Sequence, residues 1–427
     1  MSSAGLLFIV FIVLLLMNVP IALSLGVASI MAMVYIGLPL DMFPMQIYAN
    51  IGKFALLAIP FFILAGNTME KAGISEKLIN LANKFVGHRK GGLAIVGVVT
   101  SCFFAAISGS GPATVAALGV IIIPAMIKAG YGKGMSSALM ATAGAIGIVI
   151  PPSIAFVVYG AIAGVSIGKI FIAGIVPGIF IGIALIIASL ILVKNMDIEQ
   201  QERSSGKEKL EAFKDAFWGL MMPVIILGGI YGGFFTPTEA AGVAAVYGIL
   251  VGMFIYRTLS LKDLYQLLIE SAVGSAIVMF IVACAGFFAW FITTQGISQM
   301  ASNFLLQVSG NKYVFLLIVN IILLIAGCFI DATSALYIFT PIMLPVAVAL
   351  GYDPIALGVV MTVNLAIGQV TPPVGVNLYV ACGVSRIGLK EISKAVVPFI
   401  IASIVVLILI TYIPDIIIFL PNLMRIK

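Results

Sequence analysis

Prolines and hydroxyl-bearing residues interrupt an otherwise apolar sequence at four places, and their types and spacing suit ion binding. The four segments are 108–114 (Ser-Gly-Ser-Gly-Pro-Ala-Thr), 147–153 with Pro151-Pro152, 331–334 (Asp-Ala-Thr-Ser), and 368–373 with Pro372-Pro373. Proline lacks an amide hydrogen and clashes with the carbonyl group four residues earlier, so a double proline breaks a helix and frees carbonyl oxygens. Free carbonyls are costly in an apolar environment unless something binds them, and unwound backbone of this kind can coordinate sodium.

We therefore predict at least two sodium ions, one in each half of the chain, between a hydroxyl-rich tip and a double-proline break. The predicted sodium ligands are Ser108, Gly111, Ala145, Gly147, Ile150, Gly327, Asp331, Gly368 and Thr371. The half-helices beyond the breaks present positive N-termini to the same cavity, which suits a small anionic substrate. The residues predicted to contact this anion are Ser110, Thr114, Ser153, Asp331, Thr333, Ser334 and Asn377.

Asp331 is the one acid predicted within the apolar core, and two interpretations of it stay open. An acid inside a membrane is by default a functional residue, which favours a substrate or cation contact. Asp is also a preferred helix N-cap. For Glu239, which also begins a helix, capping is the favoured interpretation, while Asn364 and Gln369 serve either as ligands or in helix–helix hydrogen bonds.

The composition predicts a polytopic membrane protein. Of the 427 residues, 62% are hydrophobic and 9% are charged, whereas soluble domains have roughly 25% charged residues. This excludes soluble enzymes and nucleic-acid-binding proteins, so no nucleic-acid partner is expected despite the net charge of +6. The four cysteines have no CxxC spacing, and the lone His88 cannot build a metal site or a catalytic triad. We therefore expect no enzymatic activity.

Ten apolar stretches predict transmembrane helices, since a helix needs about 20 residues to cross the bilayer. They are 2–18, 20–37, 54–70, 135–165, 170–193, 217–235, 239–256, 268–294, 355–385 and 396–420. The stretches 92–127 and 313–349 are interrupted midway by the hydroxyl-rich segments and predict two re-entrant hairpins. Non-helical tips at that depth survive only when protein buries them or they face a water-filled cavity.

The distribution of basic residues predicts the orientation. With the N-terminus on the periplasmic side, the cytoplasmic segments would be 71–91, 128–134, 194–216, 257–267 and 386–395. These segments hold 17 of the 22 Lys and Arg residues, as the positive-inside rule requires. Segment 74–86 is amphipathic and predicts a helix lying in the membrane interface, with 297–308 as its counterpart.

The two halves resemble each other, which indicates an internal duplication. An offset of 221 residues maps Pro124 onto Pro345, Gly130-Tyr131 onto Gly351-Tyr352, Ala145-Ile146-Gly147 onto Ala366-Ile367-Gly368, the first double proline onto the second, and Pro177 onto Pro398. Five spans per half is an odd number, so the second copy must be inserted upside down. Inverted repeats with paired broken helices are typical of secondary transporters.

The predicted domains follow from this duplication. The first repeat covers 1–193, with a scaffold or arm region at 1–91, a hairpin and broken helix at 92–165, and a helix at 170–193. A cytoplasmic linker covers 194–216. The second repeat covers 217–427, with a scaffold or arm region at 217–312, a hairpin and broken helix at 313–385, and a helix at 396–420.

The chain resembles the large membrane (M) subunit of tripartite ATP-independent periplasmic (TRAP) transporters over essentially its whole length. The residues that carry the resemblance are the runs 234–241 (Phe-Phe-Thr-Pro-Thr-Glu-Ala-Ala) and 59–66 (Ile-Pro-Phe-Phe-Ile-Leu-Ala-Gly), the tip 108–112, and the two double prolines. The chain looks most like the members that import sialic acid, although those for C4-dicarboxylates are similar.

The resemblance implies sodium-driven import of a carboxylate across the bacterial inner membrane, with a soluble periplasmic binding (P) protein that delivers the substrate. It also implies a small four-helix membrane (Q) subunit, which we expect as a separate chain because no four-helix segment precedes Met1. The family is thought to work as an elevator. The mobile block would then be 92–165 and 313–385, and 2–70, 170–193, 217–294 and 396–420 would form the scaffold and arms.

Two other functions stay open on the sequence. A stand-alone sodium/dicarboxylate symporter of similar architecture would transport its substrate without a binding protein. An ion channel or passive permease would pass its substrate without stoichiometric sodium coupling.

Overall fold

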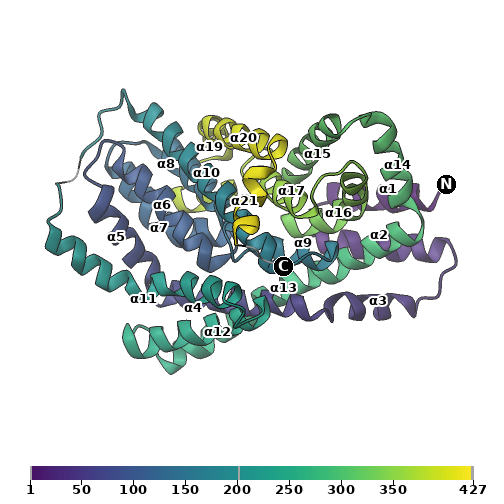
Figure 1. Cartoon of the computed structure of the whole chain (residues 1–427), viewed down its shortest axis with the longest axis horizontal. Coiled ribbons are helices and arrows are strands. Elements are labelled where there is room, and N and C mark those ends of the chain that lie inside the picture. Colours follow the sequence, from purple (N-terminus) through teal and green to yellow (C-terminus); the bar gives the residue numbers. More distant parts are fainter. Residues whose placement is uncertain (1, 201, 425–427) are drawn as a thin grey trace.

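The computed structural model describes residues 2–200 and 202–424, and within these residues all regular secondary structure is helical (Figure 1). The helices of the first half are α1 (Ser3–Leu16), α2 (Ile21–Tyr35), α3 (Met42–Ile51), α4 (Ala58–Lys71), α5 (Ile74–Val86), α6 (Gly92–Ser108), α7 (Gly111–Lys128), α8 (Lys133–Ala145), α9 (Ile154–Ala163) and α10 (Ile167–Val193). Those of the second half are α11 (Gly206–Tyr231), α12 (Pro237–Leu250), α13 (Leu261–Thr294), α14 (Ile297–Ser309), α15 (Lys312–Gly327), α16 (Ala332–Ala349), α17 (Pro354–Gly368), α18 (Val376–Ser385), α19 (Leu389–Ala395), α20 (Val397–Tyr412) and α21 (Asp415–Leu423). The all-helical class is thus confirmed.

The order of elements in α5–α9 recurs in α14–α18. Each series has an amphipathic helix, two helices joined at a short tip, and a helix that is broken at a double proline. A glycine in the left-handed region precedes the amphipathic helix in both series, at Gly73 and Gly296. Another left-handed glycine follows the tip-bearing pair, at Gly130 and Gly351. This recurrence supports the predicted duplication, and the relative orientation of the two copies stays a prediction.

The two series interlock through the second halves of their broken helices. Helix α9 packs against α16 and α17, while α18 packs against α7 and α8. The Tyr159 hydroxyl on α9 donates a hydrogen bond to the Pro354 carbonyl at the start of α17, with an O···O distance of 2.6 Å. The Asn377 amide on α18 donates to the Ala141 carbonyl on α8 at 3.1 Å. Each series therefore completes the core of the other.

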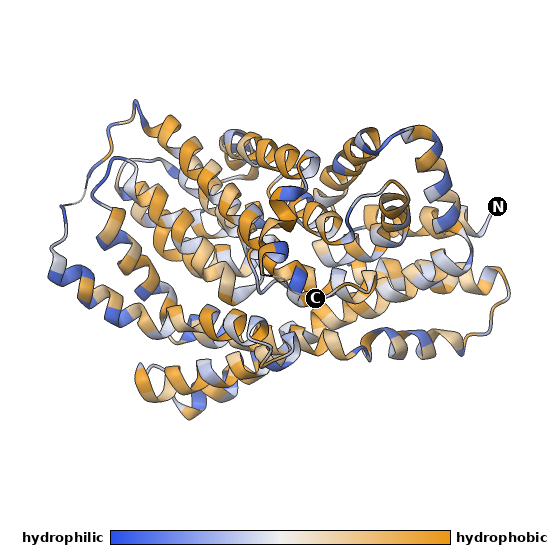
Figure 2. Ribbon diagram, viewed as in Figure 1, coloured by the Kyte–Doolittle hydropathy of each residue, from blue (hydrophilic) through white to orange (hydrophobic). Residues whose placement is uncertain are grey.

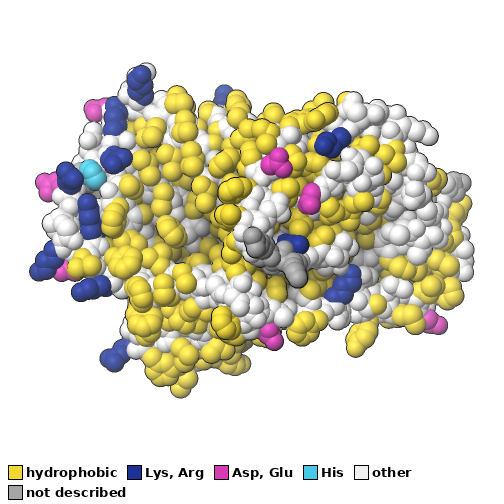
Figure 3. Space-filling view, in the orientation of Figure 1, with side chains coloured by type: hydrophobic (Ala, Val, Ile, Leu, Met, Phe, Trp, Pro, Cys, Tyr) yellow, Lys and Arg dark blue, Asp and Glu magenta, His cyan; other side chains and the backbone are white. Residues whose placement is uncertain are grey.

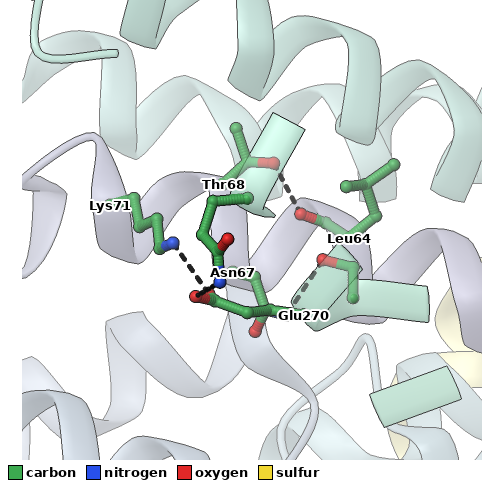
Figure 4. A network of polar contacts seen from close by, with 7 residues as sticks. Leu64, Asn67, Thr68, Lys71 and Glu270 are labelled. Carbon is green, nitrogen blue, oxygen red and sulfur yellow. Dashed lines mark hydrogen bonds and ion pairs between the residues drawn. The ribbon is translucent and has the colours of Figure 1, made fainter. Parts of the chain in front are cut away.

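Helices α12 and α13 each pack against α4, and the three helices form a second layer (Figure 1). Figure 4 shows the polar contacts that join α4 to α13. The Lys71 ammonium lies 2.7 Å from the Glu270 carboxylate, and the Asn67 amide donates to the Ser271 hydroxyl at 3.0 Å. Both members of the ion pair are partly exposed, so the pair contributes little to stability and the apolar contacts hold the layer together.

Fewer helices are long enough to cross a membrane than the ten predicted spans require. Seven helices in the described residues are long and apolar enough to cross a membrane, or eight if the bent pair α19 and α20 counts as one span. Helices α1 and α2 have 14 and 15 residues, which gives each a length of about 21 Å, less than the hydrocarbon core of about 30 Å. Hydrophobic residues nevertheless make up most of the helical ribbon in Figure 2.

Several boundaries differ from the sequence prediction. Helix α11 begins at Gly206, inside the predicted linker 194–216, because Ser205 and Glu208 form a capping box. The predicted helix 396–420 is interrupted between α20 and α21, where Pro414 cannot continue the hydrogen-bonding of α20. Helix α3 was not predicted from the sequence. The amphipathic segments 74–86 and 297–308 form α5 and α14 as expected.

Basic residues gather at one end of the molecule. In the view of Figure 3 they cluster where Figure 1 places α5, the first turns of α11 and the segment that joins α10 to α11. In this region Lys84 pairs with Glu208 at 2.9 Å, and the Lys90 ammonium donates to the Lys194 carbonyl at 2.8 Å. These residues belong to the segments that the charge count assigns to the cytoplasm.

The interlock of the two series gives a stability prediction at Gly358 on α17. A side chain there would collide with the Tyr159 ring, which lies against this glycine. We expect Gly358→Leu to lower the free energy of unfolding by about 1–3 kcal/mol or more, because buried overpacking forces backbone shifts. Thermal unfolding of the purified protein in detergent measures the change. Gly228→Leu on α11, where no atom lies near the added side chain, serves as the control, and equal melting temperatures for both variants would contradict the prediction.

Candidate functional site

The first hydroxyl-rich tip joins α6 to α7 and rests against the first double-proline break. Gly109 ends α6 in the left-handed conformation, with φ of 60°. Its carbonyl oxygen accepts a hydrogen bond from the Ile154 amide, just beyond Pro151-Pro152, at 3.4 Å. A Cβ atom on Gly109 would lie 2.7 Å from the Pro152 carbonyl oxygen. Only glycine therefore permits both the turn and the close approach.

Three oxygens of this tip lie together. The Ser108 and Thr114 hydroxyls are 2.8 Å apart, the Thr114 hydroxyl donates to the Ser110 carbonyl at 2.8 Å, and the Ser108 hydroxyl lies 3.3 Å from the same carbonyl. Gly147, at the break, packs directly against these three oxygens, which we call the oxygen triangle. A Cβ atom added at Gly147 would lie 2.7 Å from the Ser110 carbonyl oxygen and 2.8 Å from the Thr114 hydroxyl. Hydroxyl and carbonyl oxygens at this spacing suit a hard cation.

The second tip joins α15 to α16 and rests against the second break in a similar way. The Gly375 amide donates to the Cys328 carbonyl at 3.4 Å. Gly327 and Gly368 pack backbone to backbone, since a Cβ on Gly368 would lie 2.5 Å from the Gly327 Cα atom. The Thr371 hydroxyl donates to the Ile367 carbonyl at 2.7 Å. This arrangement brings the predicted ligands Gly327 and Gly368 together.

Asp331 is the N-cap of α16. Its carboxylate accepts hydrogen bonds from the Ser334 amide at 3.0 Å and from the Ser334 hydroxyl at 2.5 Å. The capping interpretation is thereby confirmed for Asp331, and its contact with a substrate or cation stays a prediction. Glu239 is likewise part of a capping box, with Thr236.

Of the remaining predicted residues, three lie at the first break and one lies at the second tip. They are Ala145, Ile150 and Ser153, and Thr333. Ala145 and Ile150 are buried, and the Ile150 side chain lies against Gly178 on α10. Ser153 caps α9 and donates its hydroxyl to the Ile148 carbonyl at 2.6 Å. Thr333 is half-buried in the first turn of α16. The side chains of Ile150 and Ser153 thus already have structural roles at the first break.

Asn377 lies at the first tip, although it belongs to the second copy. A Cβ on Gly111 would lie 3.3 Å from the Asn377 side-chain oxygen and 2.5 Å from that of Gln369. Asn364 instead donates to the Asn320 side chain at 2.8 Å, which confirms a helix–helix role. Sequence reasoning left Gln369 undecided, because its position one residue after Gly368 did not reveal that it faces the opposite copy.

The two breaks differ in exposure. Residues 147–153 are all buried, whereas Thr371 and Pro372 are half-buried and Pro373 is exposed. Each hairpin tip therefore meets a broken helix, and the second break is the more exposed of the two.

Comparison with known proteins decides the family. Residues 8–416 match the model described as the tripartite ATP-independent periplasmic transporter, DctM component. The chain belongs to this family. Its helices and its membership of the DctM family make it a multi-pass protein of the inner membrane, and its relatives are transport permeases rather than enzymes.

Three relatives of this chain are named for different substrates. The isethionate TRAP transporter permease protein DctMQ of Oleidesulfovibrio alaskensis is 45% identical over 95% of this chain, which spans 64% of that relative. The C4-dicarboxylate TRAP transporter large permease protein DctM of Rhodobacter capsulatus is 39% identical over 99% of both chains. The sialic acid TRAP transporter large permease protein SiaM of Vibrio cholerae is 36% identical over 88% of both.

A solved transporter structure shares the fold. The YdaH transporter of Alcanivorax borkumensis, described as having an unusual topology, superposes with a TM-score of 0.62 over 88% of both chains. Its sequence identity to this chain is 13%, so the likeness concerns the fold alone.

The two interpretations of Asp331 can be separated by comparing two substitutions. Asn is as good an N-cap as Asp, whereas Ala is not. We expect Asp331→Asn to keep the melting temperature and to lose most substrate uptake, because a cation contact needs the carboxylate charge. Asp331→Ala should lose uptake and also about 1 kcal/mol of stability. Uptake and thermal unfolding measured on the same preparations provide the comparison, and normal uptake by Asp331→Asn would leave capping as the only role.

Proposed function

We propose that this chain imports a small organic acid across the inner membrane by sodium-coupled secondary active transport. Membership of the DctM family supports transport, and relatives named for isethionate, C4-dicarboxylates and sialic acid support an organic acid. The observation that carries the proposal is the paired contact between tip and break, with the Ile154 amide on Gly109 and the Gly375 amide on Cys328.

Sodium binding follows from the oxygens at these contacts. In the first copy the Ser108 and Thr114 hydroxyls and the Ser110 carbonyl bond to one another within 3.3 Å, and a cation would replace these hydrogen bonds with coordination. In the second copy the ligands come from the close approach of Gly327 and Gly368 and from Asp331. We assign one ion to each copy.

An elevator motion of two inverted repeats is the proposed mechanism. The cross-packing of α9 and α18 supports a mobile block that contains 92–165 and 313–385, because neither half can move without the other. The regions 2–70, 170–193, 217–294 and 396–420 form the scaffold and arms. With the N-terminus on the periplasmic side, the basic end of the molecule faces the cytoplasm.

The substrate is proposed as a carboxylate or a related organic acid. The sequence resemblance favours sialic acid as the substrate. The C4-dicarboxylate permease of Rhodobacter capsulatus is, however, more similar to this chain (39% identical) than the sialic acid permease of Vibrio cholerae (36% identical). A periplasmic binding (P) protein delivers the substrate, and a small membrane (Q) subunit completes the complex.

The coupling can be measured by uptake into proteoliposomes that contain the M and Q chains. We expect uptake of a labelled acid only when a sodium gradient and the binding protein are both present. The reason is that sodium must occupy its sites before the mobile block can carry the substrate across the membrane. Uptake that runs equally well on a proton gradient would refute sodium coupling, and uptake without the binding protein would favour a stand-alone symporter.

The oxygen triangle gives a second test. We expect Thr114→Val to raise the sodium concentration for half-maximal uptake at least roughly tenfold, because one oxygen bonded to a charged ion is worth about 1.5–3 kcal/mol. Thr362→Val is the matched control, since its buried hydroxyl also bonds to the carbonyl four residues earlier but lies outside the proposed site. An unchanged sodium dependence for Thr114→Val would remove the triangle from the sodium site.

A further inference from the structure

The two hairpin tips differ in how the helix that follows each tip is capped. Helix α16 is capped by the Asp331 carboxylate, which accepts from the Ser334 amide. At the first tip Ser110 is the N-cap of α7, but its side chain makes no capping hydrogen bond. The first amides of a helix have no partner within the helix, and a helix N-terminus attracts anions. The N-terminus of α7 is therefore open to a ligand, whereas the Asp331 carboxylate already binds the N-terminus of α16.

Two buried side-chain oxygens lie at the open N-terminus of α7 without a hydrogen-bond partner among the described residues. They are the Gln369 and Asn377 amide oxygens. Gln369 is 7% exposed and Asn377 is fully buried. A Cβ on Gly111, the first residue of α7, would lie 2.5 Å from the Gln369 oxygen and 3.3 Å from the Asn377 oxygen. Unsatisfied oxygens of this kind are costly, so they indicate a ligand that donates hydrogen bonds.

Both features occur at one tip only. With the offset of 221 residues, Gln369 corresponds to Ile148, Asn377 to Phe156, and Gly111 to Ala332. The second tip therefore carries apolar counterparts and a methyl group where the first tip has two amides and a glycine. A purely structural need of the duplicated fold would be met in the same way in both copies. The difference points to a task that is performed once per molecule.

We infer that Gln369 and Asn377 form a specificity pair that recognises a hydrogen-bond donor next to the acid group of the substrate. This inference rests on the proposed function and names its substrate class as a hydroxylated organic acid. The carboxylate or sulfonate of the substrate binds the amides at the N-terminus of α7. Its hydroxyl donates to the two amide oxygens, which the deoxy analogue would leave unpaired.

The Asn377 amide group is held in place for this contact. Its nitrogen donates to the Ala141 carbonyl at 3.1 Å, and its backbone amide donates to the Gln369 carbonyl at 3.0 Å. One N–H group of the side chain is therefore bonded to α8, which fixes the orientation of the amide and leaves the oxygen as the acceptor. The two residues of the pair are also tied to each other through the main chain, so they move with the second break as a unit.

The test compares two pairs of acids that differ by one hydroxyl: malate with succinate, and isethionate with ethanesulfonate. Binding is measured by calorimetry on the M and Q chains in nanodiscs in sodium buffer, without the binding protein, so that its selectivity does not enter. We expect the wild type to prefer the hydroxylated member of at least one pair. Gln369→Met should reduce that preference roughly tenfold, because the variant lacks a buried acceptor for the hydroxyl, and should change the affinity for the deoxy acid much less than that for the hydroxylated acid.

Controls separate this inference from a structural effect and from the proposed function. Gln299→Met, an exposed residue on α14, should leave every affinity unchanged. Equal loss of both members of a pair in Gln369→Met would assign the residue a structural role and overturn the inference. A wild type that binds none of the acids, or binds both members equally, would overturn it as well. Sodium-driven uptake is scored separately, so transport can stand while the specificity pair falls.

Discussion

The requirement that every peptide group within a bilayer finds its partner inside the protein dominates this structure. The chain violates the simple solution, an unbroken helix, at two hairpin tips and two double prolines. It compensates by placing each tip against a break, so that Gly109 and Cys328 accept hydrogen bonds from the amides that follow the prolines. Glycines at Gly147 and Gly368 allow the approach. The same geometry leaves hydroxyl and carbonyl oxygens concentrated where the first tip meets its break.

The two series α5–α9 and α14–α18 share an order of elements but differ in charge at their tips. One tip carries the Asp331 carboxylate on its helix, and the other leaves the start of α7 open. A fixed negative charge favours cations near the second tip, while the open helix end favours an anion near the first. The residues Ser110 and Asp331, which stand at corresponding positions of the two series, therefore give the two tips different electrostatic character.

Much of this arrangement could be predicted from the sequence, because proline and glycine act locally. The hairpin tips, the breaks and the amphipathic helices α5 and α14 were found where the sequence predicts them. The early start of α11 was readable in principle from Ser205 and Glu208, but the charged residues nearby resemble a linker. The position of Asn377 at the first tip could not be read, because it depends on α18 crossing to the other copy.

The crossing of α9 and α18 has a consequence for biosynthesis. When the ribosome has released residues up to α10, the partners of α9 on α16 and α17 have not yet been made. The nascent first half must therefore wait in the lipid with Tyr159 and its neighbours uncovered, and it reaches its mature packing only after the last third of the polypeptide has been inserted. Two separately expressed halves would have to find each other before either became resistant to quality-control proteases.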